Sequence, residues 1–270
     1  MRITCRWMWG AAIAAALTIT LAAQQAPTTT YASTCVKVKP GQDAAFDQVV
    51  NGDLHNFEQT RVSSGALSGY IVLRTEMPAG RMADCDYVFL AFYSGLPKAP
   101  MTDTEITATL QKAGVGMTQE QFGEKLSQVG EEVSNSLEYN LDLVGGAQKG
   151  DYIVYNSMKV ADADVDAWIK WEKTMWAPLA QSMVNSGQLR GWALDAQIFP
   201  TGAKDRGLES TSDIFPSWVE FVEAEQHYDA GWKTVHPNDD ISASLEQLGK
   251  ICTIEHTVLY KVVDEIMAQQ

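Results

Sequence analysis

Glu172 is the residue whose type and position most directly suggest chemistry. It falls on one face of a predicted helix together with apolar residues spaced three and four apart, namely Val165, Ile169, Trp176, Leu179 and Met183. A carboxyl group on a buried helix face has a raised pKa, which suits a general acid, a general base or a group that holds a polar ligand. Alternatively, Glu172 lies at the edge of this face and pairs with Lys173 or with solvent.

His256 is the second candidate, because it falls on the apolar face of a predicted strand with Val258 and Tyr260. A neutral imidazole there could act as a base or ligate haem iron. Alternatively, it is a core histidine hydrogen-bonded to a neighbour. The remaining histidines are predicted at helix edges or in loops, and neither an HExxH spacing nor an acidic calcium loop occurs, so the sequence offers no support for a metal site.

Tryptophan is concentrated in the second half of the chain. An aromatic cavity for a flat ligand, with Trp168, Trp176 and Trp218 as its walls, is the functional interpretation, and core packing is the alternative. The tryptophans in question are Trp168, Trp171, Trp176, Trp192, Trp218 and Trp232.

Motifs and charge narrow the function classes. GxSxG, GxGxxG and Walker-type sequences are absent, which weakens hydrolase and nucleotide-binding interpretations. The chain has 34 Asp and Glu against 20 Lys and Arg, a formal net charge of −14. Nucleic acids and anionic membranes are therefore not expected as partners.

The N-terminus has the order of a secretory signal peptide. Arg2 and Arg6 precede an uncharged apolar run, and the small residues Ala22 and Ala23 follow it. We expect residues 1–23 to be removed and the product to be soluble and periplasmic or secreted, although an N-terminal membrane anchor is the alternative. Removal of both arginines takes the formal charge from −14 to −16.

Three cysteines remain after such cleavage, namely Cys35, Cys85 and Cys252. An oxidising compartment permits one disulfide among them, and the odd number leaves at least one thiol free or paired between chains.

An internal repeat sets the expected architecture. Segment 38–46 aligns with 160–168, and the same offset of 122 residues aligns 64–70 with 186–192 and 77–80 with 199–202. Near the ends, 137–139 resembles 254–256 at an offset of 117. These matches predict two units, at residues 24–147 and 148–270.

Each unit is predicted to contain strand, helix, strand, strand, helix and strand. In the second unit we expect strands at 152–160, 189–199, 214–222 and 254–263, and helices at 165–183, 228–235 and 242–250. Pro216 predicts a bulge or an unpaired edge in the third strand.

This βαββαβ order is that of the ferredoxin-like fold. Its sheet has one face under the two helices, and the other face must be buried elsewhere. We therefore expect an α+β protein in which two tandem ferredoxin-like units pack sheet to sheet as an intrachain dimeric α/β-barrel.

Segments 160–162, 171–173, 176–179, 186–192 and 199–202 resemble a group of exported, uncharacterised bacterial proteins with tandem ferredoxin-like units. The fold is similar to that of the dimeric α/β-barrel superfamily, which includes cofactor-free monooxygenases, haem-binding and haem-degrading enzymes, and NIPSNAP-type proteins. The resemblance implies a ligand site between sheet and helices. It brings no catalytic signature with it, and a shared fold does not transfer a function.

Two functional hypotheses follow. In the first, the exported protein binds a small apolar or aromatic molecule in the second unit. In the second, it is an enzyme of the cofactor-free monooxygenase or haem-handling type, with Glu172 or His256 as the acid, base or ligand. The sequence identifies neither a cofactor nor an oligomeric state.

Overall fold

A computed structural model of the chain describes residues 29–200 and 208–268. The predicted signal peptide lies outside these residues. The first unit contains β1 (Thr29–Val38), α1 (Asp43–Val49), η1 (Val50–Leu54), α2 (His55–Ser63), β2 (Gly69–Met77), η2 (Gly80–Met82), β3 (Tyr87–Ser94), α3 (Asp103–Lys112), α4 (Gln119–Val129) and β4 (Gly130–Gly145). The second contains β5 (Tyr152–Val160), α5 (Val165–Trp171), η3 (Glu172–Trp176), α6 (Ala177–Ser186), β6 (Gly191–Phe199), β7 (Leu208–Phe215), α7 (Trp218–Val222), α8 (Ala224–Val235), α9 (Ile241–Leu248) and β8 (Cys252–Met267).

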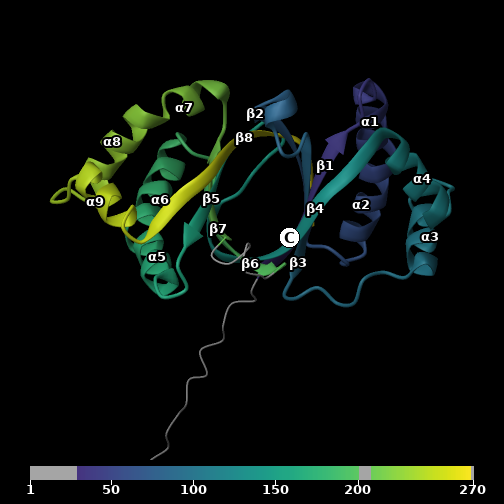
Figure 1. Cartoon of the computed structure of the whole chain (residues 1–270), viewed down its shortest axis with the longest axis horizontal. Coiled ribbons are helices and arrows are strands. Elements are labelled where there is room, and N and C mark those ends of the chain that lie inside the picture. Colours follow the sequence, from purple (N-terminus) through teal and green to yellow (C-terminus); the bar gives the residue numbers. More distant parts are fainter. Residues whose placement is uncertain (1–28, 201–207, 269–270) are drawn as a thin grey trace, which may run out of the picture.

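The strands form a closed barrel in the order β1-β3-β2-β8-β5-β7-β6-β4, and every neighbouring pair is antiparallel. Each unit contributes one four-stranded ferredoxin-like sheet, and the two sheets join at two junctions, β4 with β6 and β2 with β8. The helices of the two units cover opposite flanks of the barrel (Figure 1). The predicted fold, an intrachain dimeric α/β-barrel of two ferredoxin-like units, is confirmed.

The 122-residue repeat is visible in the elements themselves. The helix after the first strand of each unit contains a π-helical turn, at Val50–Leu54 and at Glu172–Trp176. Gly65 and Gly187, again 122 residues apart, both have positive φ after these helices, a conformation that glycine adopts without steric cost. Met77–Pro78 and Phe199–Pro200 are both cis.

The last strands also keep this offset, because β4 begins at Gly130 and β8 at Cys252. The 117-residue alignment of 137–139 with 254–256 is therefore wrong. It differs from the true register by five residues, an odd number, and so places residues on the wrong face of the strand. His256 corresponds to Ser134 and not to Tyr139.

The third strand of the second unit was predicted incorrectly at 214–222. β7 ends at Phe215, directly before Pro216, and Ser217 then caps α7 by accepting a hydrogen bond from the Glu220 N–H. Proline cannot donate to the strand ladder, and a serine followed by Glu220 is a helix-start signal. The apolar residues of this segment thus belong to a short helix.

Three apolar clusters hold the protein together. One lies between the helices and the sheet of the first unit, around Phe46, and one lies in the equivalent place in the second unit, around Trp168. The third consists mainly of inward-facing strand residues such as Ile71, Val262 and Ile214, as expected for an eight-stranded barrel that side chains can fill.

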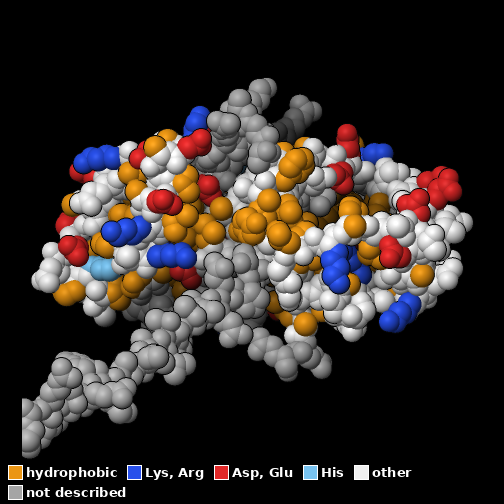
Figure 2. Space-filling view, turned by 90° about the horizontal axis from the view of Figure 1, so that it is seen from below, with side chains coloured by type: hydrophobic (Ala, Val, Ile, Leu, Met, Phe, Trp, Pro, Cys, Tyr) orange, Lys and Arg blue, Asp and Glu red, His pale blue; other side chains and the backbone are white. Residues whose placement is uncertain are grey.

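The surface carries apolar side chains over the middle of one face, with charged groups toward both ends (Figure 2). Among the described residues, no helix is long and apolar enough to cross a membrane.

Candidate functional site

Glu172 lies in the core of the second unit. It is the first residue of the π-helical turn between α5 and α6, and only 2% of its surface is exposed. Burial raises the pKa of its carboxyl group to about 8, and the nearby charge of Asp213 raises it further. The neighbouring Trp168 indole N–H partly opposes this shift. At neutral pH the protonated Glu172 carboxyl is therefore the predominant form, and it can donate a hydrogen bond.

Asp213 on β7 is the second buried carboxyl group of this core. It accepts a hydrogen bond from Trp176 Nε1 at 3.1 Å and another from Tyr228 on α8. Burial raises the pKa of Asp213 to about 6, and these two hydrogen bonds oppose the shift. Glu172 and Asp213 thus have pKa values on either side of neutrality, the arrangement expected of an acid paired with a base.

Aromatic rings surround the two carboxyl groups. Trp176 stacks on Trp171 with ring centroids 6.4 Å apart and packs against Tyr228 at 5.1 Å. The Nε1 atoms of Trp168, Trp171 and Trp192 are buried and have no hydrogen-bond partner among the described residues. Buried donors without an acceptor are rare in native proteins and call for an explanation such as a bound water or ligand.

A groove of about 420 Å³ opens on the surface beside this core. It is lined by Lys159–Asp162 and Asp164 on one side and by Gly249–Thr253 on the other. Cys252 both lines the groove and belongs to the Trp168 cluster. Burial raises the pKa of its thiol to about 11, and the charge of Glu172 contributes to this shift. Cys252 thus belongs to the lining of the groove and also lies close enough to Glu172 to be affected by its charge.

The structure brings some of the predicted site residues together and separates others. Trp168 and Trp176 belong to the apolar cluster of the second unit, and the Trp168 indole interacts with the Glu172 carboxyl group. Trp218 lies on α7, is 47% exposed and packs against Tyr152 and Phe221 at the outer edge of the unit.

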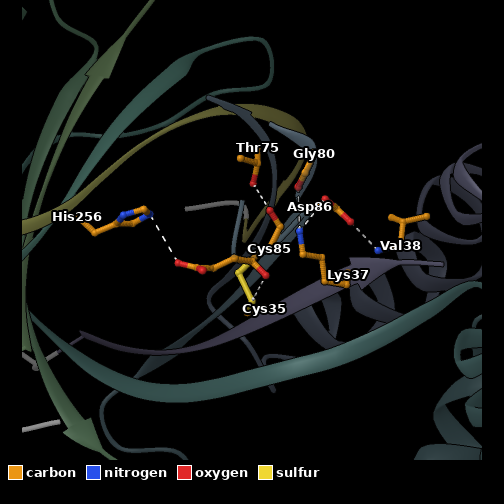
Figure 3. Close-up of a disulfide and its surroundings, with 9 residues drawn as sticks. Cys35, Lys37, Val38, Thr75, Gly80, Cys85, Asp86 and His256 are labelled. Atoms are coloured by element: carbon orange, nitrogen blue, oxygen red, sulfur yellow. Dashed lines mark hydrogen bonds and ion pairs between the residues drawn. A yellow bond between two sulfur atoms is a disulfide. The ribbon is translucent and has the colours of Figure 1, made fainter. Parts of the chain in front are cut away.

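His256 lies on the other side of the sheet from Glu172. It pairs with Ser157 on β5, two residues from the interior residue Val258, and therefore points into the barrel. Its Nε2 lies 3.7 Å from Asp84 of the first unit, which precedes Cys85 (Figure 3). His256 and Glu172 consequently do not form one site.

The other histidines have local partners. His55 Nδ1 lies 2.6 Å from Asp264, His227 is near Glu220 and Glu223, and His236 Nε2 lies 2.8 Å from the Met175 carbonyl oxygen. Within the described ranges, no group of three or more His, Cys, Asp or Glu side chains is placed to hold a metal ion.

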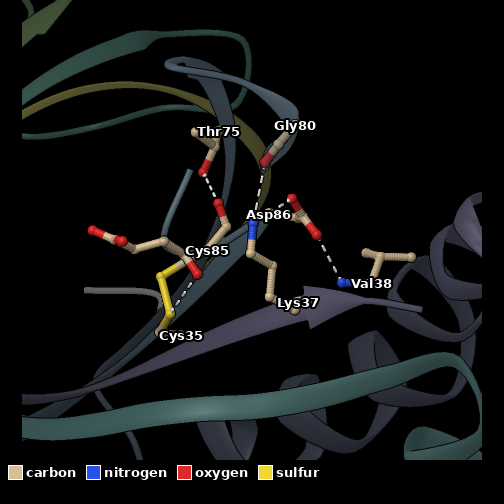
Figure 4. Close-up of polar contacts among 8 residues, drawn as sticks. Cys35, Lys37, Val38, Thr75, Gly80, Cys85 and Asp86 are labelled. Carbon is tan, nitrogen blue, oxygen red and sulfur yellow. Dashed lines mark hydrogen bonds and ion pairs between the residues drawn. A yellow bond between two sulfur atoms is a disulfide. The ribbon is translucent and has the colours of Figure 1, made fainter. Parts of the chain in front are cut away.

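The cysteine pairing is Cys35 with Cys85, and Cys252 is free and buried. The disulfide ties β1 to the segment before β3. Beside it, Asp86 accepts hydrogen bonds from the Val38 N–H at 2.9 Å and from Lys37 Nζ at 3.3 Å (Figure 4).

Sequence reasoning missed Asp213 and Tyr228. The strand prediction for 214–222 began one residue after Asp213 and so left it out. The available signal was the alternation of side chains along β7, which places Thr211, Asp213 and Phe215 on one face of the strand. A charged residue between two residues of a helix-facing strand face indicates a buried polar contact.

Comparison with known proteins supports the fold. No family model and no curated protein matches the chain. A proposed monooxygenase from Fusobacterium nucleatum aligns over 90% of this chain and 95% of its own, with a TM-score of 0.56 and 8% identity. A second, from Lactobacillus acidophilus, covers 89% of this chain and 97% of its own, with a TM-score of 0.50 and 11% identity. At these identities the likeness concerns the fold alone, so the chain is a tandem member of the ferredoxin-like, dimeric α/β-barrel fold.

Proposed function

We propose that the second unit binds a small aromatic molecule between its helices and its sheet, with Glu172 as the group that recognises it. The observation that carries this proposal is the buried, protonated carboxyl group of Glu172 among tryptophans, at a position where the first unit has Val50. A core that needed only packing would have no reason to keep this group, because burying a carboxyl group without full pairing destabilises the fold.

The chemistry of the surroundings narrows the ligand class. Glu172 and the indole groups of Trp168 and Trp192 all offer hydrogen-bond donors, whereas the acceptor Asp213 is already engaged by Trp176 and Tyr228. Flat rings suit aromatic walls. The expected ligand is therefore a neutral aromatic molecule that carries acceptor oxygens, such as an aryl ketone.

A second candidate function is catalysis of a proton transfer in this bound molecule, as in a cofactor-free monooxygenase. It is favoured by the separated pKa values of Glu172 and Asp213. In this reading Asp213 is the base and Glu172 is the acid.

The histidine nominated for haem lies outside the proposed ligand site. The His256 side chain is 40% exposed beside the exposed Asp84, on the opposite side of the sheet from the tryptophan cluster. No step of the proposed function is therefore assigned to haem.

Binding can be tested with 1-indanone and indane, two molecules of the same shape of which only the first has a carbonyl oxygen. Calorimetry should show that 1-indanone binds more tightly than indane. Glu172→Leu should weaken binding of 1-indanone at least tenfold, because about 1.4 kcal/mol of hydrogen bonding is lost. Val50→Leu, at the matched position of the first unit, should leave binding unchanged.

Glu172→Gln separates binding from catalysis, because glutamine keeps a donor but cannot transfer a proton. It should retain binding and lose any turnover. If neither 1-indanone nor indane changes the heat signal or the melting temperature, the proposed site is wrong.

We also propose that the protein is exported. The support is the sequence of residues 1–23 and the Cys35–Cys85 disulfide, a bond typical of oxidising compartments. Mass spectrometry of the protein from its native cell should find an N-terminus near Gln24, and an intact Met1 would contradict the proposal.

A further inference from the structure

The interior of the barrel contains a second pair of buried carboxyl groups, unrelated to Glu172. Glu138 on β4 and Asp195 on β6 are 7% and 3% exposed. They are diagonal neighbours at the junction that joins the two units, because Glu138 lies opposite Gln197 and Asp195 lies opposite Asn140. Tyr31 Oη and Ser136 Oγ each donate a hydrogen bond of 2.7 Å to Glu138. Asn140 Nδ2 donates one of 2.9 Å to Asp195.

The equivalent positions at the other junction are apolar or aromatic. With the 122-residue offset, Asp195 corresponds to Leu73 and Asn140 to Val262, and both pairs are cross-strand partners. In the same way Tyr31 and Glu138 correspond to the partners Ile153 and Tyr260. The β2–β8 junction is thus filled by an apolar cluster, whereas the β4–β6 junction contains acids, an amide and a phenol at matching places.

Within residues 29–200 and 208–268, no cationic side chain pairs with Glu138 or Asp195. Besides the hydrogen-bond donors named above, three titratable groups interact electrostatically with Glu138. They are Tyr155 on β5, Tyr260 on β8 and Glu209 near the start of β7. β2 and β3 contribute apolar side chains to the interior. His256, whose side chain is 40% exposed, lies 3.7 Å from Asp84. Two carboxylates without a cation cannot both be ionised in a buried site at tolerable cost.

The hydrogen bonds indicate where the proton is held. Glu138 accepts from two hydroxyl groups, which favours its ionised form. Burial raises the pKa of Asp195 to about 8, and the charge of Glu138 is the next cause. Asp195 therefore keeps a proton at neutral pH.

We propose that Glu138, Asp195 and their donors form a proton-dependent latch that holds the two units together at the β4–β6 junction, and that loss of the Asp195 proton loosens this junction while the β2–β8 junction stays closed. The latch is separate from the ligand site, which lies on the other side of the sheet.

Hydrogen exchange on the full chain, in buffer with EDTA so that no metal ion pairs with the carboxylates, tests the proposal at both junctions at once. One proton is released on opening, so the opening equilibrium should rise about tenfold for each pH unit below the pKa of Asp195. After correction for the intrinsic exchange rate, amides of 137–145 and 191–199 should therefore lose about fiftyfold of protection between pH 6 and pH 8, because the slope flattens as the pH reaches the pKa of Asp195. Amides of 69–77 and 259–267 serve as the internal control and should lose much less protection, limited to the general fall in stability over this pH range.

Two variants locate the effect. Asn140→Val/Asp195→Leu introduces the residue types of the equivalent pair Val262 and Leu73 at the other junction, and it should abolish the pH dependence. Asp195→Asn should also abolish the pH dependence, and it changes the shape of the side chain less. Equal loss of protection at both junctions, no loss at β4 and β6, or a pH dependence that survives in these variants would each overturn the proposal. The wild-type comparison of the two junctions decides the matter even if neither variant folds.

Discussion

Glu172 and Val50 are structural counterparts. Each is the first residue of a π-helical turn, they are 122 residues apart, and each is 2% exposed. The same backbone irregularity thus presents a carboxyl group to one core and an apolar side chain to the other. Because π-helical turns often occur at functional sites, this pair offers a direct comparison between a position that carries a carboxyl group and one that carries an apolar side chain.

The comparison predicts opposite effects on stability. Glu172→Leu should raise the melting temperature at pH 8 by several degrees, because it removes a buried polar group. Val50→Glu should lower it, because it buries a carboxyl group among the apolar residues of the first core. Differential scanning calorimetry of both variants checks this, and a loss of stability in Glu172→Leu would mean that the carboxyl group supports the fold.

Stability should fall as the pH rises from 5 to 8. The pKa values of Glu172, Glu58 and Asp213 in the folded protein are about 8, 7 and 6, above their ordinary values. Burial is the leading cause in each case. Groups of this kind favour the folded state fully at pH values below the pKa of the unfolded chain, and the benefit is lost as the pH rises through the folded pKa.

Thermal melts at half-unit pH intervals test this expectation. A shift of one pKa unit corresponds to about 1.4 kcal/mol, and about 1 kcal/mol moves the melting temperature by about 2–4 °C in a protein of this size. The curve for Glu172→Leu should be flatter than that of the wild type. A melting temperature that increases steadily up to pH 8 would contradict the assignment of these groups.

Tyr228 should support Asp213. Tyr228→Phe removes one of the two donors and leaves a buried carboxylate with Trp176 alone, so the free energy of unfolding should fall by about 1–3 kcal/mol. Tyr152→Phe is the matched control. Within the described residues, its hydroxyl group accepts a hydrogen bond of 3.3 Å from the partly exposed Lys261 ammonium group and makes no other side-chain hydrogen bond. Urea denaturation of the two variants should show a clear loss for the first and little change for the second.

The disulfide should stabilise the first unit by restricting the unfolded chain. Cys35 and Cys85 are 50 residues apart, and closing a loop of that length contributes about 4 kcal/mol in the chain-entropy model. Cys35→Ser/Cys85→Ser should lower the urea midpoint, whereas Cys252→Ala, which leaves the disulfide intact, should have a smaller effect. Equal midpoints for the double variant and the wild type would show that the bond does not restrain the unfolded state.

Much of the fold could be predicted from the sequence because the repeat consists of short segments whose residues indicate their own local structure. The glycines at 65 and 187 and the alternation in segment 152–160 each report on their own neighbourhood. The segment after Pro216 was predicted incorrectly because its apolar residues suit a strand as well as a short helix, and only the capping hydrogen bond from Glu220 to Ser217 distinguishes them.

The candidate site was predictable in part for the same reason. Glu172 stands out against its own helix, so its local pattern is sufficient to nominate it. The pair of Glu138 and Asp195 has no such signal, because the two residues belong to different units and meet only when β4 joins β6. The alternation of Ser136, Glu138 and Asn140 along one face of β4 was a visible hint, but identifying the partner required the strand order of the closed barrel.

The joining of both sheets in one chain has a consequence for how the two halves can change. In a barrel made of two identical subunits, every substitution occurs twice, so a buried acid that serves one half also burdens the other. Here the halves are encoded separately. Evolution can therefore place Glu172 in one core and Val50 in the other. It can likewise place acids at one junction and apolar residues at the equivalent junction. Each buried polar group then destabilises the molecule at one position and not at two.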